Sequence, residues 1–157
     1  MHRLTQVSIL LTSLLMVAAC GGDDDPAGPT PADITGSWAY EATLTGTVGG
    51  EPITCSVDDA IVELTATDDS LTGSTNFGTL TCTTGGDTTV DPLGSYTIVN
   101  GSLDGTRIEF DFGADTWHHE GTVSVSDHRM SGTVAIAIDL PEESVLLTGS
   151  WSARDVT

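Results

Sequence analysis

Two adjacent histidines, His118 and His119, are the first candidates for chemistry in this chain of 157 residues. Imidazole carries protons near neutral pH and binds metal ions. Residues 117–125 alternate between less polar and more polar types, which predicts a strand whose neighbouring side chains point to opposite faces. The two imidazoles therefore cannot bind one metal ion together. We expect His118 to face solvent and His119 to be half-buried.

Acidic side chains are the most numerous titratable groups, with 23 Asp and Glu residues. Asp111 and Asp115 flank an expected turn with Glu120 nearby, and oxygen-rich loops of this kind bind Ca²⁺. The Asp-x-Asp-x-Asp-Gly spacing of a dedicated calcium loop is missing, so only adventitious calcium is indicated. The pairs at 58–59 and 142–143 are expected in solvated turns. We predict no metal site and no cofactor.

A serine hydrolase is the catalytic alternative that these residue types allow. His119 or His128, with the many serines and aspartates, would supply a Ser-His-Asp triad. The sequence has no Gly-x-Ser-x-Gly segment, which exposes the nucleophile in many such enzymes, and no phosphate-binding loop. We therefore expect a protein that is not an enzyme, with a hydrolase as the less favoured alternative.

The N-terminus has the organisation of a secretory signal peptide. His2 and Arg3 precede an apolar run over residues 7–18 that is too short to cross a bilayer. The run ends in Val17-Ala18-Ala19-Cys20, which resembles the lipobox of bacterial lipoproteins. This resemblance implies that residues 1–19 are removed and that acyl chains on Cys20 hold the protein on membrane lipid. The residue after Cys20 is Gly21, and a residue other than Asp at this position resembles the pattern of enterobacterial lipoproteins of the outer membrane. We therefore expect a cell-envelope protein at the outer membrane, either periplasmic or surface-facing.

Cys55 and Cys82 remain once Cys20 is assigned to lipid. Disulfides persist outside the cytoplasm, so we expect these two cysteines to be bonded to each other. In the chain-entropy model, closing a loop of about 28 residues stabilises a fold by roughly 3 to 4 kcal/mol. Two cysteines this far apart supply too few ligands for zinc.

The charge is strongly negative, at −19, and the chain contains no lysine. Removal of residues 1–19 would leave Arg107, Arg129 and Arg154 against all 23 acidic residues. Such a field repels nucleic acid and anionic lipid surfaces, which bind proteins through Lys and Arg. We therefore expect no nucleic-acid partner, and solubility at a cell surface or in a saline medium is the simplest explanation of the charge.

The composition divides the chain into three parts. After the signal peptide, residues 20–32 form a lipidated cysteine with a flexible acidic linker rich in Pro, Gly and Asp. Residues 33–157 are rich in Thr, Val, Ile, Gly and Ser and contain no ten-residue segment with a helical apolar stripe. They are predicted to form one all-β domain.

Alternating apolar residues predict which side chains share the inner face of each strand. Asp104-Gly105 predicts a hairpin turn, and the preceding strand points either Tyr96 and Ile98 or Val99 and Leu103 inward, with a bulge at Asn100-Gly101 as an option. Symmetric pairing about the last turns places His119 opposite Ile136 and Val134 opposite Trp151. The expected inward residues of the first strands are Trp38, Tyr40, Ala42 and Leu44, then Ala60, Val62, Leu64 and Ala66.

We predict an antiparallel up-and-down meander of eight to ten short strands. The unbroken hairpin order favours a closed barrel, because closure removes both exposed edges, and a β-sandwich is the alternative.

Gly36-Ser37-Trp38 near the start of the domain and Arg154 near its end resemble the calycin pattern of lipocalins, fatty-acid-binding proteins and avidins. The resemblance implies that the Trp38 indole lies across the barrel base and that Arg154 covers it by a cation–π contact. The segment Gly36-Ser37-Trp38 also resembles the first strand of streptavidin-like proteins, but the residues that follow it differ from the ligand-contacting run of those proteins.

The function expected from these features is a non-catalytic, membrane-anchored β-barrel that binds a small apolar ligand. The alternative within binding modules is a solidly packed structural or protein-interaction unit of the envelope. An open or a filled interior distinguishes the two.

Overall fold

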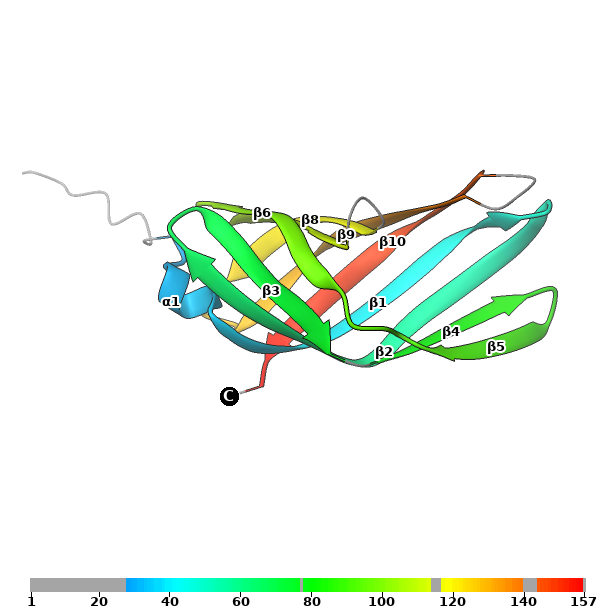
Figure 1. The fold of residues 1–157 in the computed structure, drawn as a ribbon, viewed down its shortest axis with the longest axis horizontal. Coiled ribbons are helices and arrows are strands. Elements are labelled where there is room, and N and C mark those ends of the chain that lie inside the picture. Colours follow the sequence, from blue (N-terminus) through cyan, green and yellow to red (C-terminus); the bar gives the residue numbers. More distant parts are fainter. Residues whose placement is uncertain (1–27, 77, 114–116, 140–143, 157) are drawn as a thin grey trace, which may run out of the picture.

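The computed structural model describes residues 28–156 except 77, 114–116 and 140–143, and it contains one helical turn and ten antiparallel strands (Figure 1). None of the helices in these ranges has the length and apolar character needed to cross a membrane. The elements are α1 (Pro31–Ile34), β1 (Gly36–Val48), β2 (Glu51–Thr67), β3 (Ser70–Asn76), β4 (Thr79–Thr84), β5 (Asp87–Pro92), β6 (Thr97–Asp104), β7 (Arg107–Phe112), β8 (Trp117–Ser124), β9 (Arg129–Asp139) and β10 (Ser144–Asp155).

Eight of the strands form a closed ring in the order β1, β10, β9, β8, β7, β6, β3 and β2, because β2 also pairs with β1. The predicted all-β antiparallel meander is therefore confirmed. The ring is not evenly round and is compatible with both the barrel and the sandwich that the sequence allowed.

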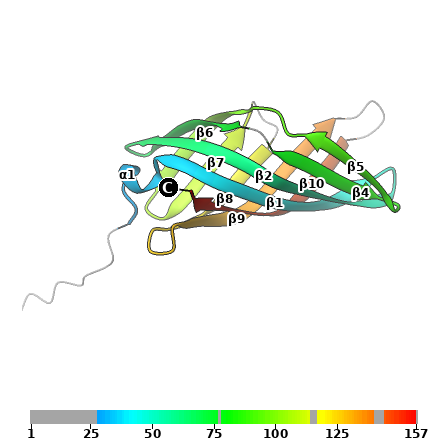
Figure 2. The same ribbon diagram turned by 90° about the horizontal axis from the view of Figure 1, so that it is seen from below.

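The β4–β5 hairpin departs from simple hairpin order. The long strand β2 pairs with β3 through residues 61–67 and with β4 through residues 53–58, while β3 pairs with β6. As a result, β4 and β5 extend beyond the ring alongside one half of β2 (Figure 2).

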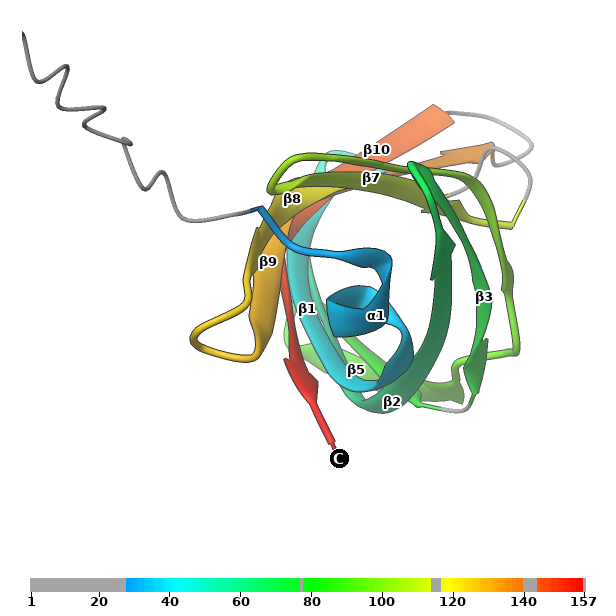
Figure 3. The same ribbon diagram turned by 90° about the vertical axis from the view of Figure 1, so that its left-hand side faces the viewer.

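A short turn lies across one end of the ring, which we call the α1 end (Figure 3). The Asp33 carboxylate accepts hydrogen bonds from the Thr30 backbone N–H and hydroxyl, and these bonds close the turn. Ile34 is fully buried, and its carbonyl accepts a 2.9 Å hydrogen bond from Trp38 Nε1. Gly36 links α1 to β1 with φ of 151°, a conformation that favours glycine.

The alternation predicted for the first strands is confirmed, since all eight residues expected to face inward on β1 and β2 are buried. The two options for β6 are resolved by the bulge at Asn100-Gly101. Asn100 has φ of 52°, and the extra residue turns both Ile98 and Leu103 inward. The following turn contains Gly105 and Thr106, one residue later than predicted.

Two predicted registers were wrong by two residues. His119 lies opposite Val134, and Trp151 lies opposite Gly132. Side chains alternate with a period of two along a strand, so this shift keeps every residue on its predicted face. Asp58 and Asp59 were also placed wrongly in a turn. They lie inside β2, at a bulge where Asp59 has φ of 57°.

The predicted closure by Arg154 is corrected as well. The terminal strands β1 and β10 do pair, but Arg154 lies opposite Ala39 and is exposed, whereas Trp38 lies opposite Asp155 and is buried. Neighbouring residues point to opposite faces, so the guanidinium lies outside the ring and the indole inside. The Trp38 indole N–H donates a hydrogen bond to the Ile34 carbonyl of α1.

Candidate functional site

His119 lies at the centre of an aromatic cluster that fills the ring toward its α1 end. Its imidazole stacks on Phe110 with ring centroids 4.5 Å apart and contacts Phe112 at 4.3 Å. Trp151 and Tyr40 meet it edge-on, each with centroids 5.7 Å away. This half of the interior is packed with side chains.

A hydrogen bond of 2.9 Å joins the Tyr40 hydroxyl to His119 Nε2, and both side chains are buried. Burial lowers the pKa of His119 to about 3 and raises the pKa of Tyr40 well above its usual value, because a charged form would lose its hydration. His119 is therefore neutral at physiological pH. Its Nδ1 has no hydrogen-bond partner within the described ranges.

His119 was predicted to be half-buried and is instead fully buried. The difference arises because the ring of strands closes around His119. The alternation of residues along one strand does not predict such closure. The side chain that forms a hydrogen bond with His119 is Tyr40, and it is not the serine that a Ser-His-Asp triad requires. His128, the other candidate base, lies in the exposed β8–β9 turn with its Nδ1 3.7 Å from Asp155.

Two glycines make room for Trp151. Gly121 and Gly132 face each other across β8 and β9, and a Cβ on Gly121 would lie 2.8 Å from the Trp151 ring. The Trp151 indole N–H donates to the Glu120 carbonyl at 3.2 Å. Large and small residues thus complement each other on the inner face.

An apolar pocket of about 540 Å³ occupies the opposite end of the fold, which we call the pocket end. Its volume lies within the range of small-molecule sites. The walls come from β1, β2, β4, β8, β9 and β10 and from the segment just before β6, so residues far apart in sequence meet here. The lining residues are Leu44, Val48, Ile53, Cys55, Leu80, Cys82, Tyr96, Trp117, Ile136, Ala137, Ile138, Asp139, Val145 and Leu147.

Tyr96 and Trp117 are the aromatic lining residues of the pocket, and their ring centroids are 6.3 Å apart. Trp117 also lies 6.3 Å from Phe112, centroid to centroid, which connects the pocket to the aromatic cluster. The pocket therefore begins where the packed half of the interior ends.

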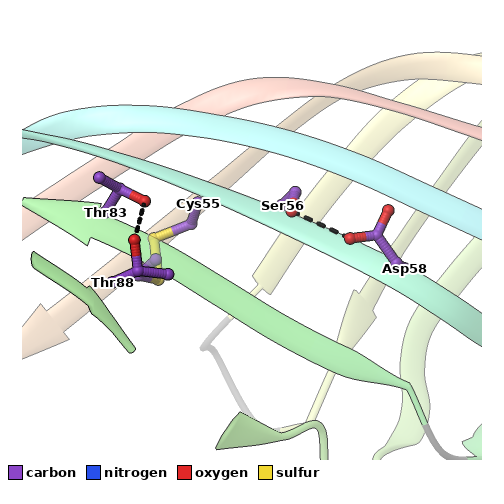
Figure 4. Close-up of a disulfide and its surroundings, with 6 residues drawn as sticks. Cys55, Ser56, Asp58, Thr83 and Thr88 are labelled. Atoms are coloured by element: carbon purple, nitrogen blue, oxygen red, sulfur yellow. Dashed lines mark hydrogen bonds between the residues drawn. A yellow bond between two sulfur atoms is a disulfide. The ribbon is translucent and has the colours of Figure 1, made fainter. Parts of the chain in front are cut away.

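The Cys55–Cys82 disulfide, predicted from the sequence, is present in one wall of the pocket (Figure 4). The two cysteines lie directly opposite each other on β2 and β4, with Cα atoms 4.1 Å apart. Beside it, the Thr83 and Thr88 hydroxyls share a 3.1 Å hydrogen bond between β4 and β5. The disulfide attaches the projecting hairpin to the ring, and the threonine pair joins the two strands of the hairpin.

The sheet is open at the pocket end, within the part of the chain that the structure describes. β5 pairs only with β4, and residues 137–139 of β9 pair only with β10. Ala137, Ile138 and Asp139 are exposed pocket-lining residues. The pocket is therefore reached from solvent.

A polar network lies on the outer face of β7 and β8, where Glu109 and Glu120 are directly opposite each other. His118 Nε2 is 3.8 Å from Glu109 and 3.5 Å from Glu120. The three side chains converge as ligands of a divalent cation would, an arrangement that the sequence did not reveal. Arg107 Nη2 lies 3.9 Å from Glu109 and 3.8 Å from Glu120, so their charges are already partly balanced.

The other imidazole nitrogen of His118 is 2.8 Å from Asp111, whose second oxygen accepts a hydrogen bond from the Asn100 amide. The hydrogen bond to Asp111 raises the pKa of His118. Burial raises the pKa of Asp111, but the hydrogen bonds from Asn100 and His118 outweigh it and leave that pKa below its usual value. His118 is half-exposed, in agreement with its predicted position facing solvent.

Several predicted residues lie outside the described ranges. These are the lipidation site Cys20 with its signal peptide, Asp115, and Glu142 and Glu143. The described part of the linker ends in α1, which begins at Pro31, two residues before the predicted start of the domain.

Comparison with protein-family models, curated proteins and solved structures found no match to this chain.

Proposed function

We propose that this chain is an exported, membrane-anchored lipoprotein whose all-β domain binds a small apolar ligand in the pocket and carries out no catalysis. The proposal combines the N-terminal lipobox pattern, the closed antiparallel ring with its paired terminal strands and the geometry of the pocket. Cys20 would carry the acyl anchor in the cell envelope, at the outer membrane.

The observation that carries the ligand-binding part is the composition of the pocket wall. Thirteen of its residues are aliphatic, aromatic or disulfide-bonded, and Asp139 is the charged one. Apolar surface that stays in contact with water is unfavourable by about 25 cal/mol for each Å². A ligand that covers this surface removes it from water, and the resulting hydrophobic free energy favours binding.

The alternative, a solidly packed structural unit, is less consistent with this interior. Side chains fill the α1 end, and the same packing would be expected to continue through the ring if packing were its only purpose. The pocket end is instead walled on several sides and open to solvent.

The position of the chain entry suits an anchored receptor. Residues 28–30 lead into α1, so the linker joins the domain at the end opposite to the pocket. An acylated Cys20 would hold the α1 end toward the membrane and leave the pocket accessible from the aqueous side.

The test is a titration with N-phenyl-1-naphthylamine, an uncharged apolar dye that fluoresces when it leaves water. We expect one dye per chain and competition by uncharged alkanes or alcohols. Leu80→Trp places an indole into the pocket and should weaken dye binding by about tenfold or more, through loss of the buried contact area.

Val90→Trp is the matched control, because Val90 lies on β5, is 63% exposed and does not line the pocket. It should leave dye binding unchanged. Urea unfolding of both variants checks that each is folded. Equal dye binding by Leu80→Trp and the unmodified protein, or no binding by either, would contradict the proposed ligand site.

A further inference from the structure

We propose that the pocket selects a cationic amphiphile, a molecule with one hydrocarbon chain and an amine or quaternary ammonium head group. This inference rests on the proposed function, because it names the class of ligand that the same pocket takes. The observations behind it are the charges around the pocket and their distribution over the fold.

The pocket wall contains no basic side chain. An anionic head group, such as the carboxylate of a fatty acid, would need a donor or a positive charge to replace its hydration. Each wall strand pairs with at least one neighbouring strand, so part of its backbone hydrogen-bonding capacity is already used. A carboxylate is therefore disfavoured at this site.

All three arginines of the described ranges lie toward the α1 end. Arg129 and Arg154 face each other at the end of β9 and β10 that is next to α1. Arg107 begins β7 and lies opposite Thr122 of β8, which in turn lies opposite Ser131 of β9. Arg107 is therefore at nearly the same level of the sheet as Arg129. The cationic groups of the domain are thus separated from the pocket by the length of the ring.

The pocket end carries only acidic groups among the charged residues of the described ranges near the lining. Asp139 lines the rim, and its Oδ1 accepts a 2.7 Å hydrogen bond from the Ser144 hydroxyl, which holds the carboxylate in place. Glu51 pairs with the lining residue Val48, and Asp87 pairs with Thr84 at the tip of the adjacent hairpin. A hydrocarbon chain in the pocket would place its head group within this negative field.

The selectivity is measured with three ligands of equal chain length, namely decyltrimethylammonium, 1-decanol and decanoate. Each is titrated below its micelle concentration into the purified full chain with its disulfide intact, and tryptophan fluorescence, to which Trp117 in the pocket contributes, reports binding. We expect decyltrimethylammonium to bind about tenfold more tightly than decanoate at low salt, with decanol between them. The difference should shrink at high salt, because the charges near the rim are solvent-exposed.

Asp139→Asn keeps the size of the side chain and removes its charge, and it should reduce the preference for the cation several-fold. Asp69→Asn, the same change in the β2–β3 turn at the α1 end, is the control and should leave the preference unchanged. Decanoate binding as tightly as the cation, or a preference that persists in Asp139→Asn, would overturn this inference while dye binding still supports a pocket. If none of the three ligands binds and the dye also fails, the proposed function fails with it.

Discussion

A hydrogen bond joins Tyr40 and His119 inside the aromatic cluster, and its buried surroundings make it costly to disturb. Each group has lost its hydration, and the pair compensates this loss by one hydrogen bond. The depressed pKa of His119 follows from the same burial. Burial therefore keeps His119 neutral in the folded state at mildly acidic pH, where an exposed histidine with a pKa of about 6.5 would bind a proton.

Replacing one partner should cost more than replacing both. Tyr40→Phe leaves His119 Nε2 buried without a partner and should lower the free energy of unfolding by about 1 to 3 kcal/mol. Tyr40→Phe combined with His119→Phe removes both polar groups and keeps the ring stacking, so it should recover part of this loss. Urea unfolding at pH 7.5 measures the double-mutant cycle. Additive effects of the two substitutions would show that the hydrogen bond contributes nothing.

The β4–β5 hairpin is the element whose attachment depends most on a single bond. β4 pairs with β2 on one side and β5 on the other, and the Cys55–Cys82 disulfide crosses the β2–β4 contact. Within the described ranges β5 pairs with β4 alone, whereas every strand of the ring has two neighbouring strands.

Cys55→Ala combined with Cys82→Ala should reduce the free energy of unfolding by roughly 3 to 4 kcal/mol, since the unfolded chain regains the entropy of an open loop. Hydrogen exchange should rise more in β4 and β5 than in β8 and β9. Reduction of the unmodified protein should reproduce both effects. Two free thiols in the unreduced, denatured protein would contradict the bond itself.

At the scale of the whole molecule, the point where the chain enters the domain and the pocket lie at opposite ends. The N-terminal linker enters at the α1 end, and the pocket opens at the other end, beyond the closed ring. The arginines of the described ranges lie toward the α1 end, whereas carboxylates lie at both ends of the domain. If the chain is anchored as we propose, this arrangement would present the pocket to the aqueous phase.

The anchor is tested by Cys20→Ser, because serine has no thiol to accept diacylglycerol. This variant should lose palmitate labelling and keep its signal peptide, as measured by labelling and by the mass of the exported chain. The Cys55→Ala, Cys82→Ala protein is the matched control and should be labelled normally. Unchanged labelling of Cys20→Ser would refute the lipoprotein proposal.

The sequence alone determined which side chains are buried on the long strands and where most turns fall. Alternation along β1 and β2 identified the inward residues, and Asp104-Gly105 located the turn between β6 and β7 to within one residue. These are local properties, because a strand with one buried face shows its period of two directly in the sequence. The pairing of Cys55 with Cys82 followed from the expected compartment and the number of cysteines.

Only the tertiary structure decided which distant strands meet. A shift of two residues preserves every face, so alternation could not distinguish His119 opposite Val134 from His119 opposite Ile136. The pairing of β3 with β6 sends β4 and β5 past the ring, and this creates the open pocket end beside the packed core. The complete burial of His119 and the position of Asp139 on the pocket rim depend on ring closure, which is a non-local property of the chain.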